Sequence, residues 1–206
     1  MYLNQALKNP IFKTIAFCGG ELGMPCYVVG GFVRDFILKR NTIKDIDILA
    51  IGNAIELAQK VAEKLPNKTK INVFKTYGTA MLRFNKIELE FVTARKESYR
   101  SESRNPEISK GSLEDDQKRR DFTINSLAVS LNKSDYGRLL DPFSGIDDIK
   151  NKLIVTPHDP NITFKDDPLR MLRAIRFSTQ LNFKINQFEL KSIKKNYKRI
   201  NIITKE

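Results

Sequence analysis

The sequence predicts an α/β (α+β) protein in which a small mixed β-sheet with flanking helices is followed by a helical segment. Three observations support this fold class. Apolar runs of strand length recur between residues 27 and 92, the last three runs are separated by gaps too short for crossover helices, and the chain beyond residue 160 has helical spacing. A length of 206 residues fits one domain or slightly more. We place the division between 1–150 and 151–206.

The first 50 residues alternate between helix and strand signals. Apolar residues at helical spacing predict a leading helix over 2–17, which glycines and Pro25 then interrupt. A short strand is predicted over 27–29, followed by a glycine pair and a helix over 32–38. Residues 45–50 alternate in character and predict a second strand.

The middle of the chain predicts one helix and three strands. The amphipathic stretch 54–65, closed by a proline, predicts the helix. The runs 71–74, 80–84 and 87–92 follow with short gaps, which favours neighbouring strands of a mixed sheet.

The remaining chain begins with a polar stretch. Residues 97–118 contain few apolar side chains and predict a mobile loop that is too long for a simple connector. Helices are predicted over 122–131, about 167–181 and 187–198, with a turn at 141–145 after the first of them.

The charge balance favours a polyanionic partner. Lys and Arg total 36 against 24 Asp and Glu, which gives a formal net charge of +12. Nucleic acid or a nucleotide is the natural partner of such a chain. Residues 151–206 hold 12 basic and 5 acidic side chains, so we expect the polyanion surface on this segment.

The few histidines and cysteines exclude several classes of site. A single histidine, His158, rules out His-rich metal sites, so an enzyme of this sequence would rely on carboxylates. Cys18 and Cys26 lack metal-ligand or redox spacing, which predicts half-buried, reduced thiols in a cytoplasmic protein. We find neither a leader pattern nor a run of about 18 apolar residues, and so expect no membrane partner.

The first functional motif is the glycine pair Gly30 and Gly31, followed by Arg34. A backbone without side chains can approach a phosphate closely, helix N–H groups point at it, and Arg34 adds positive charge. The alternative is an ordinary tight turn with an exposed arginine.

The second motif is the pair Asp45 and Asp47. Residues two apart on a strand share a face, so the two carboxylates lie close together and favour a bound cation. Mg²⁺ suits them because it prefers oxygen ligands and bridges substrate phosphates. An exposed acidic strand edge is the alternative, but the position one strand after the glycine turn favours the metal site.

The third motif, Glu88 and Glu90, lies on another predicted strand. One of these glutamates could join the two aspartates on one sheet face, where three carboxylates suit two-metal chemistry at a phosphate. The pattern leaves open which glutamate does so, and a charged outer face accounts for at least one.

The fourth motif is the stretch 119–125, Arg-Arg-Asp-Phe-Thr-Ile-Asn. Two cations beside a Thr/Asn helix start suit phosphate and ribose contacts. The alternative is a helix start with an exposed basic pair.

The fifth motif spans 166–177. Asp167 predicts a helix cap with proline at the first helical position, and Arg170 and Arg173 share one face of that helix. Asp167 and Arg170 could offer an acceptor and a forked donor to the edge of a nucleobase. The alternative is a capped surface helix with an internal ion pair.

In this order and spacing, the five motifs resemble the bacterial-type (class II) tRNA nucleotidyltransferase and poly(A) polymerase family of the polymerase-beta nucleotidyltransferase superfamily. The resemblance runs through residues 27–35, 45–47, 89–95, 119–128 and 166–177.

The resemblance implies a catalytic nucleotidyltransferase head over 1–150 and a partial helical neck over 151–206 that selects the nucleotide and binds RNA. It implies Mg²⁺ on Asp45 and Asp47, with Glu90 as the third catalytic carboxylate. The nucleotide-binding residues it implies are Gly30, Gly31, Arg34, Arg120, Asp121, Asn125, Asp167, Arg170 and Arg173. Asp167 and Arg170 would read the base.

The implied reaction is template-independent transfer of CMP and AMP from CTP and ATP to the 3′ end of tRNA, with release of pyrophosphate. Residues 97–118 would help to change the specificity for the incoming nucleotide from CTP to ATP. The alternatives are an A-adding enzyme or poly(A) polymerase, a nucleotide- or RNA-binding module without turnover, and a small-molecule nucleotidyltransferase. The neck motif and the basic tail disfavour the last.

Two features depart from the family pattern. The first acid of the family's Glu-Asp-x-x-Arg motif is Asp166 here, a conservative change that spares Asp167 and Arg170. The family's body and tail helices are missing, and residues 200–206 resemble the start of its next motif, cut before the arginine. We therefore expect a fragment with a weaker grip on tRNA.

Overall fold

The computed structural model describes the chain apart from residues 41–44, 67–68, 100–105 and 204–206. Its helices are α1 (Pro10–Glu21), α2 (Gly31–Ile37), α3 (Ala54–Lys64), α4 (Leu113–Lys118), α5 (Gly145–Asn151), α6 (Pro160–Asp166), α7 (Leu169–Leu181) and α8 (Gln187–Asn196). Short 3₁₀ turns are η1 (Asn4–Leu7), η2 (Lys75–Tyr77), η3 (Thr123–Asn125) and η4 (Tyr197–Ile202). The strands are β1 (Cys26–Val29), β2 (Asp45–Ala50), β3 (Ile71–Phe74), β4 (Thr79–Phe84), β5 (Ile87–Thr93), β6 (Arg95–Ser98), β7 (Glu107–Lys110), β8 (Ala128–Ser130), β9 (Leu139–Leu140), β10 (Leu153–Ile154) and β11 (Lys184–Ile185).

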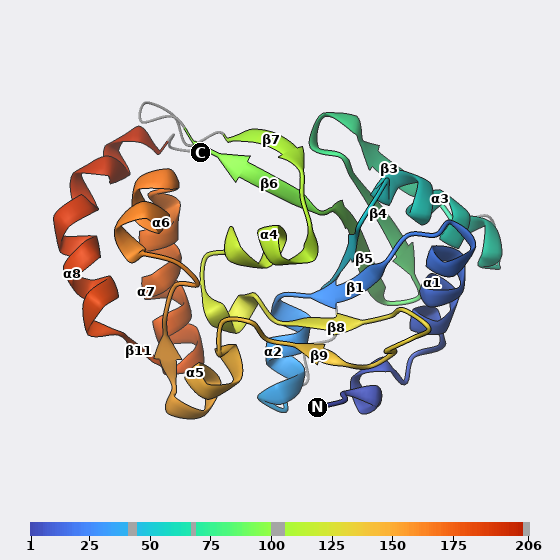
Figure 1. Ribbon diagram of the computed structural model, residues 1–206, viewed down its shortest axis with the longest axis horizontal. Coiled ribbons are helices and arrows are strands. Elements are labelled where there is room, and N and C mark those ends of the chain that lie inside the picture. The colour runs from blue at the N-terminus through green and yellow to red at the C-terminus, as the bar shows by residue number, and fades with distance from the viewer. Residues whose placement is uncertain (41–44, 67–68, 100–105, 204–206) are drawn as a thin grey trace.

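A seven-stranded mixed sheet in the order β3-β4-β5-β2-β1-β8-β9 forms the centre of the molecule (Figure 1). The β2–β5 pair is parallel, whereas β1–β2 and β4–β5 are antiparallel. Two small ladders, β6–β7 and β10–β11, lie outside this sheet. The predicted fold class is therefore confirmed.

One face of the sheet carries the main core. Alternation along β2, β4 and β5 turns Ile48, Leu82 and Phe91 toward this face, and all three are fully buried. Helix α3 packs on β4 and β5, and α1 packs on α3. The apolar stripe of α3 and the alternating strands thus bury each other.

The opposite face has only a small apolar cluster, formed by Val29, Leu49, Ala94 and Ala128. On the same face, the β2–β5 register places Asp47 directly beside Glu90. This face is therefore the one on which polar chemistry can be built.

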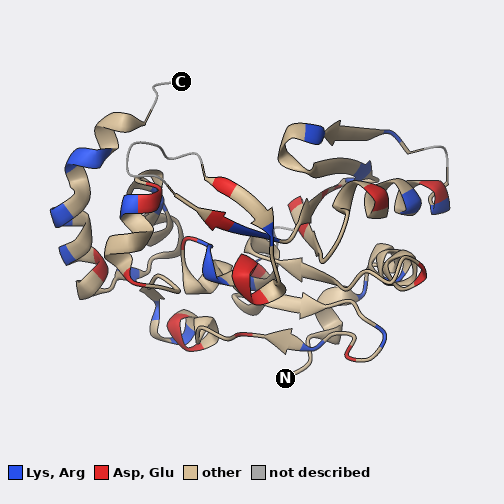
Figure 2. Ribbon diagram, turned by 45° about the horizontal axis from the view of Figure 1, so that its top comes forward, with Lys and Arg blue, Asp and Glu red and all other residues tan. Residues whose placement is uncertain are grey.

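The last helices stand beside the sheet. Helix α6 packs on both α7 and α8 (Figure 1). Basic side chains follow the outer helix α8, with Lys194 and Lys195 in its last turn (Figure 2). No helix in the described ranges is long and apolar enough to cross a membrane.

Two predicted helices, over 2–17 and over 122–131, were wrong. The single helix over 2–17 is divided into η1 and α1, because Pro10 starts a new helix capped by Asn9, and α1 continues through Gly19 to Glu21. The helix over 122–131 is instead η3 followed by strand β8. This stretch is buried almost throughout, so its apolar residues carry no helical period.

The prediction of a mobile loop over 97–118 was also wrong. Apart from residues 100–105, which lie outside the described part, it forms the β6–β7 hairpin and α4. Ser112 caps α4 and exchanges hydrogen bonds with Asp115, a polar signal that composition alone does not separate from a loop.

Helices α5 and α6 were missed. Asp159 and Pro160 start α6 with the same Asp-Pro signal that we expected Asp167 and Pro168 to provide for the next helix. Helix α7 instead begins at Leu169, although Asp167 accepts a hydrogen bond from the Leu169 N–H at 3.1 Å.

Both cysteines are free thiols, as predicted, but they are fully buried rather than half-buried. Burial raises the pKa of Cys26 to about 12. Gly19 lets α1 approach β1 closely at this point, since a Cβ there would lie 2.8 Å from the Cys26 sulfur. The thiols thus belong to the core.

Candidate active site

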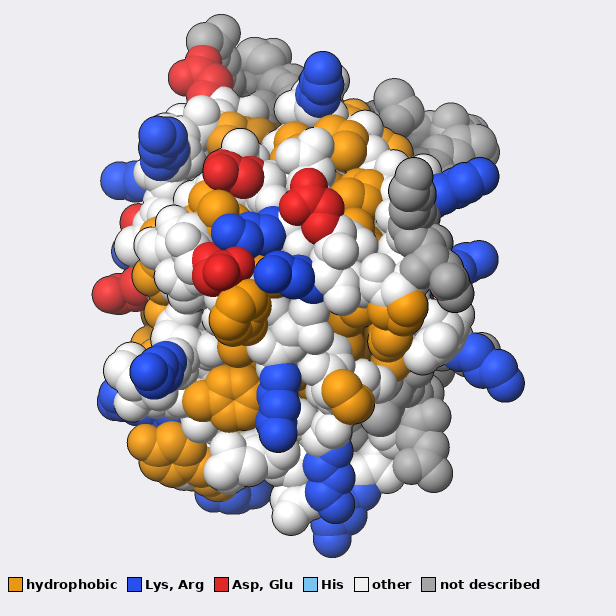
Figure 3. All heavy atoms as spheres, turned by 90° about the vertical axis from the view of Figure 1, so that its right-hand side faces the viewer, with side chains coloured by type: hydrophobic (Ala, Val, Ile, Leu, Met, Phe, Trp, Pro, Cys, Tyr) orange, Lys and Arg blue, Asp and Glu red, His pale blue; other side chains and the backbone are white. Residues whose placement is uncertain are grey.

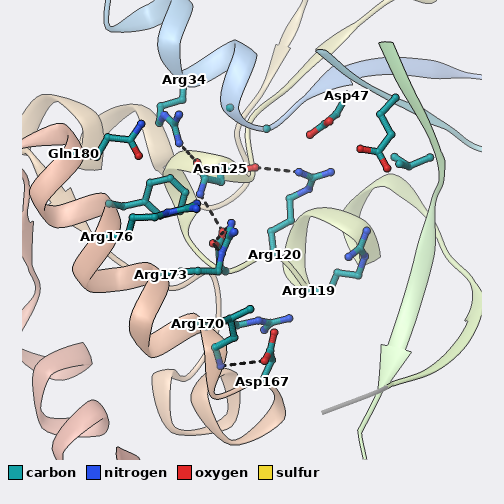
Figure 4. A pocket seen from close by; sticks show the side chains of 17 residues that line it. Arg34, Asp47, Arg119, Arg120, Asn125, Asp167, Arg170, Arg173, Arg176 and Gln180 are labelled. Atoms are coloured by element: carbon teal, nitrogen blue, oxygen red, sulfur yellow. Dashed lines mark hydrogen bonds and ion pairs between the residues drawn. The ribbon is translucent and has the colours of Figure 1, made fainter. Parts of the chain in front are cut away.

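A cavity of about 630 Å³ lies between the polar face of the sheet and α7 (Figure 4). Its described lining holds four acidic residues and six arginines: Asp47, Glu90, Asp121, Asp167, Arg34, Arg119, Arg120, Arg170, Arg173 and Arg176. Gly30, Gly31 and Asn125 also line it. Every predicted site residue except Asp45 therefore contributes to the lining.

The sheet end of the cavity is a pair of carboxylates. Burial raises the pKa of Asp47, and Asp116 and Asp45 raise it further against the opposing effect of Arg120. Burial likewise raises the pKa of Glu90, with additional repulsion from Asp47. Repelling carboxylates with raised pKa values are a donor set that a hard divalent cation would stabilise.

The neighbouring acids lie further out. Glu88 faces the same way as Glu90 but forms a 2.9 Å ion pair with exposed Arg83 and is absent from the cavity lining. Asp45 is exposed at the start of β2, opposite Glu88. Within the part of the chain that the structure describes, no group of three or more His, Cys, Asp or Glu side chains is arranged to hold a metal ion.

The glycine turn packs directly against Asp47. Gly30 has φ +74°, a conformation that side-chain-bearing residues rarely adopt. A Cβ at this position would lie 3.0 Å from Arg120 Nη1 and 3.1 Å from Asp47 Oδ2. Gly30 therefore keeps space between a carboxylate and a guanidinium on the cavity wall.

A buried carboxylate, Asp116, holds two of the arginines. Its Oδ1 accepts a hydrogen bond from Arg119 Nε at 2.9 Å, and its Oδ2 accepts one from Arg120 Nε at 3.0 Å. The Asp116 side chain is fully buried. The prediction missed Asp116, and it named Arg119 in the fourth motif without placing it among the site residues. The spacings of three and four residues from Asp116 to the paired arginines would have indicated contact once a helix was recognised.

A second network joins four of the predicted residues. Asn125 Nδ2 donates to Asp121 Oδ1 at 3.0 Å, and Arg34 Nη1 donates to Asn125 Oδ1 at 2.6 Å. Arg173 Nε donates to Asp121 Oδ2 at 2.7 Å. Asp121 thus holds Arg173 of α7 directly and Arg34 of α2 through Asn125.

The ring of Phe177 lies among three of these cations. The guanidinium carbons of Arg34 and Arg173 are each 5.2 Å from its centroid, and that of Arg176 is 4.7 Å away. Phe177 and Gln180 follow Arg173 at helical spacing, so projecting α7 as a helix would have placed these missed residues on the same face.

The far end of the cavity contains Asp167 and Arg170 (Figure 4). Arg170 Nη2 lies 3.3 Å from the Tyr99 hydroxyl and 3.9 Å from Glu97 Oε2, and the guanidinium sits over the Tyr99 ring. These contacts tie the predicted base-reading arginine to the β6–β7 hairpin.

Taken together, the paired carboxylates on β2 and β5, the glycine turn and the wall of arginines define a nucleotidyltransferase-type fold and site. The family model described as the poly A polymerase head domain matches residues 26–155, and the chain belongs to this family.

Its relatives are tRNA-processing enzymes. The chain is 44% identical over 168 residues to an A-adding tRNA nucleotidyltransferase of Aquifex aeolicus, covering 82% of this chain and 20% of that protein. A solved CCA-adding enzyme without ligand is 34% identical, with a TM-score of 0.86 over 97% of this chain and 49% of that one.

A tRNA nucleotidyltransferase solved with a primer tRNA and an incoming ATP analog is 39% identical, with a TM-score of 0.77 over 90% of this chain and 50% of that one. The chain therefore spans about half the length of these solved structures and about a fifth of the Aquifex protein.

Proposed function

We propose that this chain carries the active site of a tRNA nucleotidyltransferase, which adds CMP and AMP from CTP and ATP to the 3′ end of tRNA. The observation that supports this most directly is one cavity that contains both the Asp47–Glu90 pair and the Asp167–Arg170 pair. The first suits phosphoryl chemistry and the second suits recognition of a base edge. Residues 1–150 would form the catalytic head, and 151–206 part of the nucleotide-selecting, RNA-binding neck.

In the proposed reaction, the 3′ oxygen of the RNA attacks the α-phosphorus of the nucleotide. A new phosphodiester bond forms, the bond to the bridging oxygen breaks, the hydroxyl releases its proton to solvent, and pyrophosphate leaves. Arg34 and Arg120 would neutralise the triphosphate, and Arg173 would extend this charge along α7. Asp121 and Asn125 would hold these cations in place, because their polar atoms already bind Arg34 and Arg173.

Asp47 and Asp45, with Glu90 beside them, would hold Mg²⁺. This ion would supply positive charge at the reacting phosphate and lower the pKa of the attacking hydroxyl. The support is the oxygen donor set and the raised pKa values of Asp47 and Glu90, together with the divalent metal use typical of the family. Asp45 would complete the set from two residues earlier on the same strand face.

The base would be read by Asp167 and Arg170. Their side chains come from the start of α7, and the Tyr99 and Glu97 contacts of Arg170 connect them to the β6–β7 hairpin. A change in that hairpin would therefore move Arg170, which supports a role for this region in the change from C to A. Two fully buried free thiols are consistent with a cytoplasmic location.

The second candidate is A-addition alone, which the Aquifex relative favours because it is named an A-adding enzyme. The discriminating experiment offers labelled CTP and ATP, singly and together, to tRNA transcripts that lack the terminal CCA, with Mg²⁺ present. CTP followed by ATP incorporation is the expected result. ATP incorporation alone would shift the assignment to A-addition or poly(A) synthesis, and nucleotide binding without turnover would contradict the enzymatic proposal.

A further inference from the structure

The polar face of the sheet continues past the carboxylates to its edge strand. In the strand register, one row on this face runs Asp47, Glu90, Met81, Asn72, and the next runs Val92, Thr79, Phe74. Direct cross-strand partners share a face and neighbouring strands lie about 4.8 Å apart. Val92 lines the cavity, so the second row leads from the cavity to the edge of the sheet.

Two large aromatic side chains are exposed at the end of this row. Phe74 is 44% exposed and Tyr77, in the turn between β3 and β4, is 66% exposed. The turn is anchored to the last residue of β5, because the Thr93 hydroxyl donates to the Gly78 carbonyl at 3.3 Å. Phe74 thus ends a row that begins at the cavity lining, and both rings are exposed to solvent rather than buried in the core.

The segment that forms β3 and β4 is itself basic, although Arg83 pairs with Glu88 of β5. Residues 69–87 contain Lys70, Lys75, Arg83 and Lys86 and no acidic residue. On the side of the molecule that carries α3, Lys and Arg side chains project from the rim and acidic groups lie between them (Figure 3). Exposed aromatic rings interleaved with cations are typical of surfaces that bind single-stranded nucleic acid by base stacking.

The order of the strands gives this surface a direction. Gly30 and the triphosphate-binding cations lie on the β1 side of Asp47, whereas Glu90, Met81 and Phe74 follow on the other side. In an in-line displacement, the attacking hydroxyl and the leaving group occupy opposite sides of the phosphorus. An RNA end that approaches over β5, β4 and β3 meets this requirement.

We propose that Asn72, Phe74, Tyr77 and Met81 form an acceptor platform, which binds the single-stranded 3′-terminal nucleotides of the RNA. Bases next to the reacting terminus stack on Phe74 and Tyr77, and Lys75 contacts a phosphate. The identity of the occupant as an RNA acceptor rests on the proposed function. The platform positions the acceptor and is separate from the residues that bind the incoming nucleotide.

The test uses an acceptor-stem RNA that lacks the terminal A and in which fluorescent 2-aminopurine replaces the first of the two terminal cytosines. Stacking on an aromatic ring quenches this probe. We expect the wild-type chain to quench it, and the double variant Phe74→Ala/Tyr77→Ala to lose the quenching and to raise the RNA Kd about tenfold or more. Phe74→Trp should retain both, and Phe17→Ala, which removes a 55% exposed ring from α1, should behave as wild type.

Binding of an ATP analog checks that the variants keep their nucleotide site and should not change. Equal quenching and equal Kd values in the wild type and the double variant would overturn the platform, even if the chain incorporates CTP and ATP. Failure of the wild type to bind the RNA at all would also overturn it. Aromatic-dependent quenching without incorporation would retain the platform and contradict the proposed catalytic function instead.

Discussion

The sheet end of the cavity and its helical walls differ in how their charges are balanced. At the sheet end, Asp47 and Glu90 repel each other and have raised pKa values. Along the helical walls, in contrast, the cations are held by protein acceptors: Arg119 and Arg120 by Asp116, and Arg173 by Asp121. Arginines paired with carboxylates are held in place before the substrate binds. Two neighbouring carboxylates repel each other, and a bound cation would relieve that repulsion. The contrast separates the proposed reaction centre from the residues that hold the substrate.

The largest expected effect is on turnover at the unbalanced end. Asp47→Ala should lower nucleotide incorporation by about 10³-fold, because the proposed metal and the reacting phosphate would lose a central ligand. Glu88→Gln is the matched control, since Glu88 shares the strand face but pairs with Arg83 outside the cavity, and its activity should stay near wild type. Initial rates with saturating CTP or ATP measure both. Near-normal rates for Asp47→Ala would contradict the assignment of the reaction centre.

The next effect is on stability. Here we expect substitution at the helical wall to lower the free energy of unfolding more than substitution at the sheet end does. Asp116→Asn should lower the free energy of unfolding by about 3 kcal/mol, because removing one partner of a buried ion pair leaves charges without compensation. Asp47→Asn should leave it unchanged or raise it, because the substitution removes repulsion. Urea unfolding followed by circular dichroism measures both variants. Equal destabilisation by the two substitutions would show that the charge balance of the two ends is the same.

Much of the sheet end was predictable because a strand has a period of two. That period placed Asp47 and either Glu88 or Glu90 on one face before any contact was known. It could not choose between the glutamates, which share the face. The choice depends on the parallel β2–β5 register, which sets Glu90 beside Asp47, and such a pairing joins segments about 40 residues apart.

The helical walls were less accessible to sequence reasoning. Arg34, Asn125, Asp121 and Arg173 were each expected to contact the nucleotide, but their mutual network depends on packing between distant segments. Asp116 was missed because a polar composition hid a short capped helix. Fully buried segments such as β8 posed a different problem, since a continuous apolar run fits helix and strand equally well.

Gly30 lies between Asp47 of the sheet end and Arg120 of the helical walls, so substituting it should disturb both regions. Gly30→Ala forces a side chain into a φ of +74° and brings its Cβ to within 3.1 Å of Asp47 Oδ2. We expect a loss of about 1–2 kcal/mol of stability and about tenfold in incorporation. Gly20→Ala is the control, because nothing lies within 4 Å of a Cβ there and Gly20 is outside the cavity lining. Identical behaviour of the two variants would show that the turn does not separate Asp47 from Arg120.

The smallest effect is on the pH dependence of stability. Because the folded protein raises the pKa of Asp47 and Glu90, it binds their protons more tightly than the unfolded chain does. Their contribution to stability is therefore greatest below about pH 4 and is lost as pH rises through the folded pKa values. Glu90 is only partly buried, so solvent screening keeps this effect small.

Unfolding curves with EDTA should accordingly show that the double variant Asp47→Asn/Glu90→Gln gains stability relative to the wild type as pH rises from 4 to 7. Mg²⁺ at neutral pH should then raise the Tm of the wild type and leave that of the variant unchanged, because an ion bound only by the folded state stabilises it by mass action. An equal shift of Tm in both proteins would place the ion elsewhere. The repulsion at the sheet end would in that case be relieved by the substrate's own cations rather than by a site built into the chain.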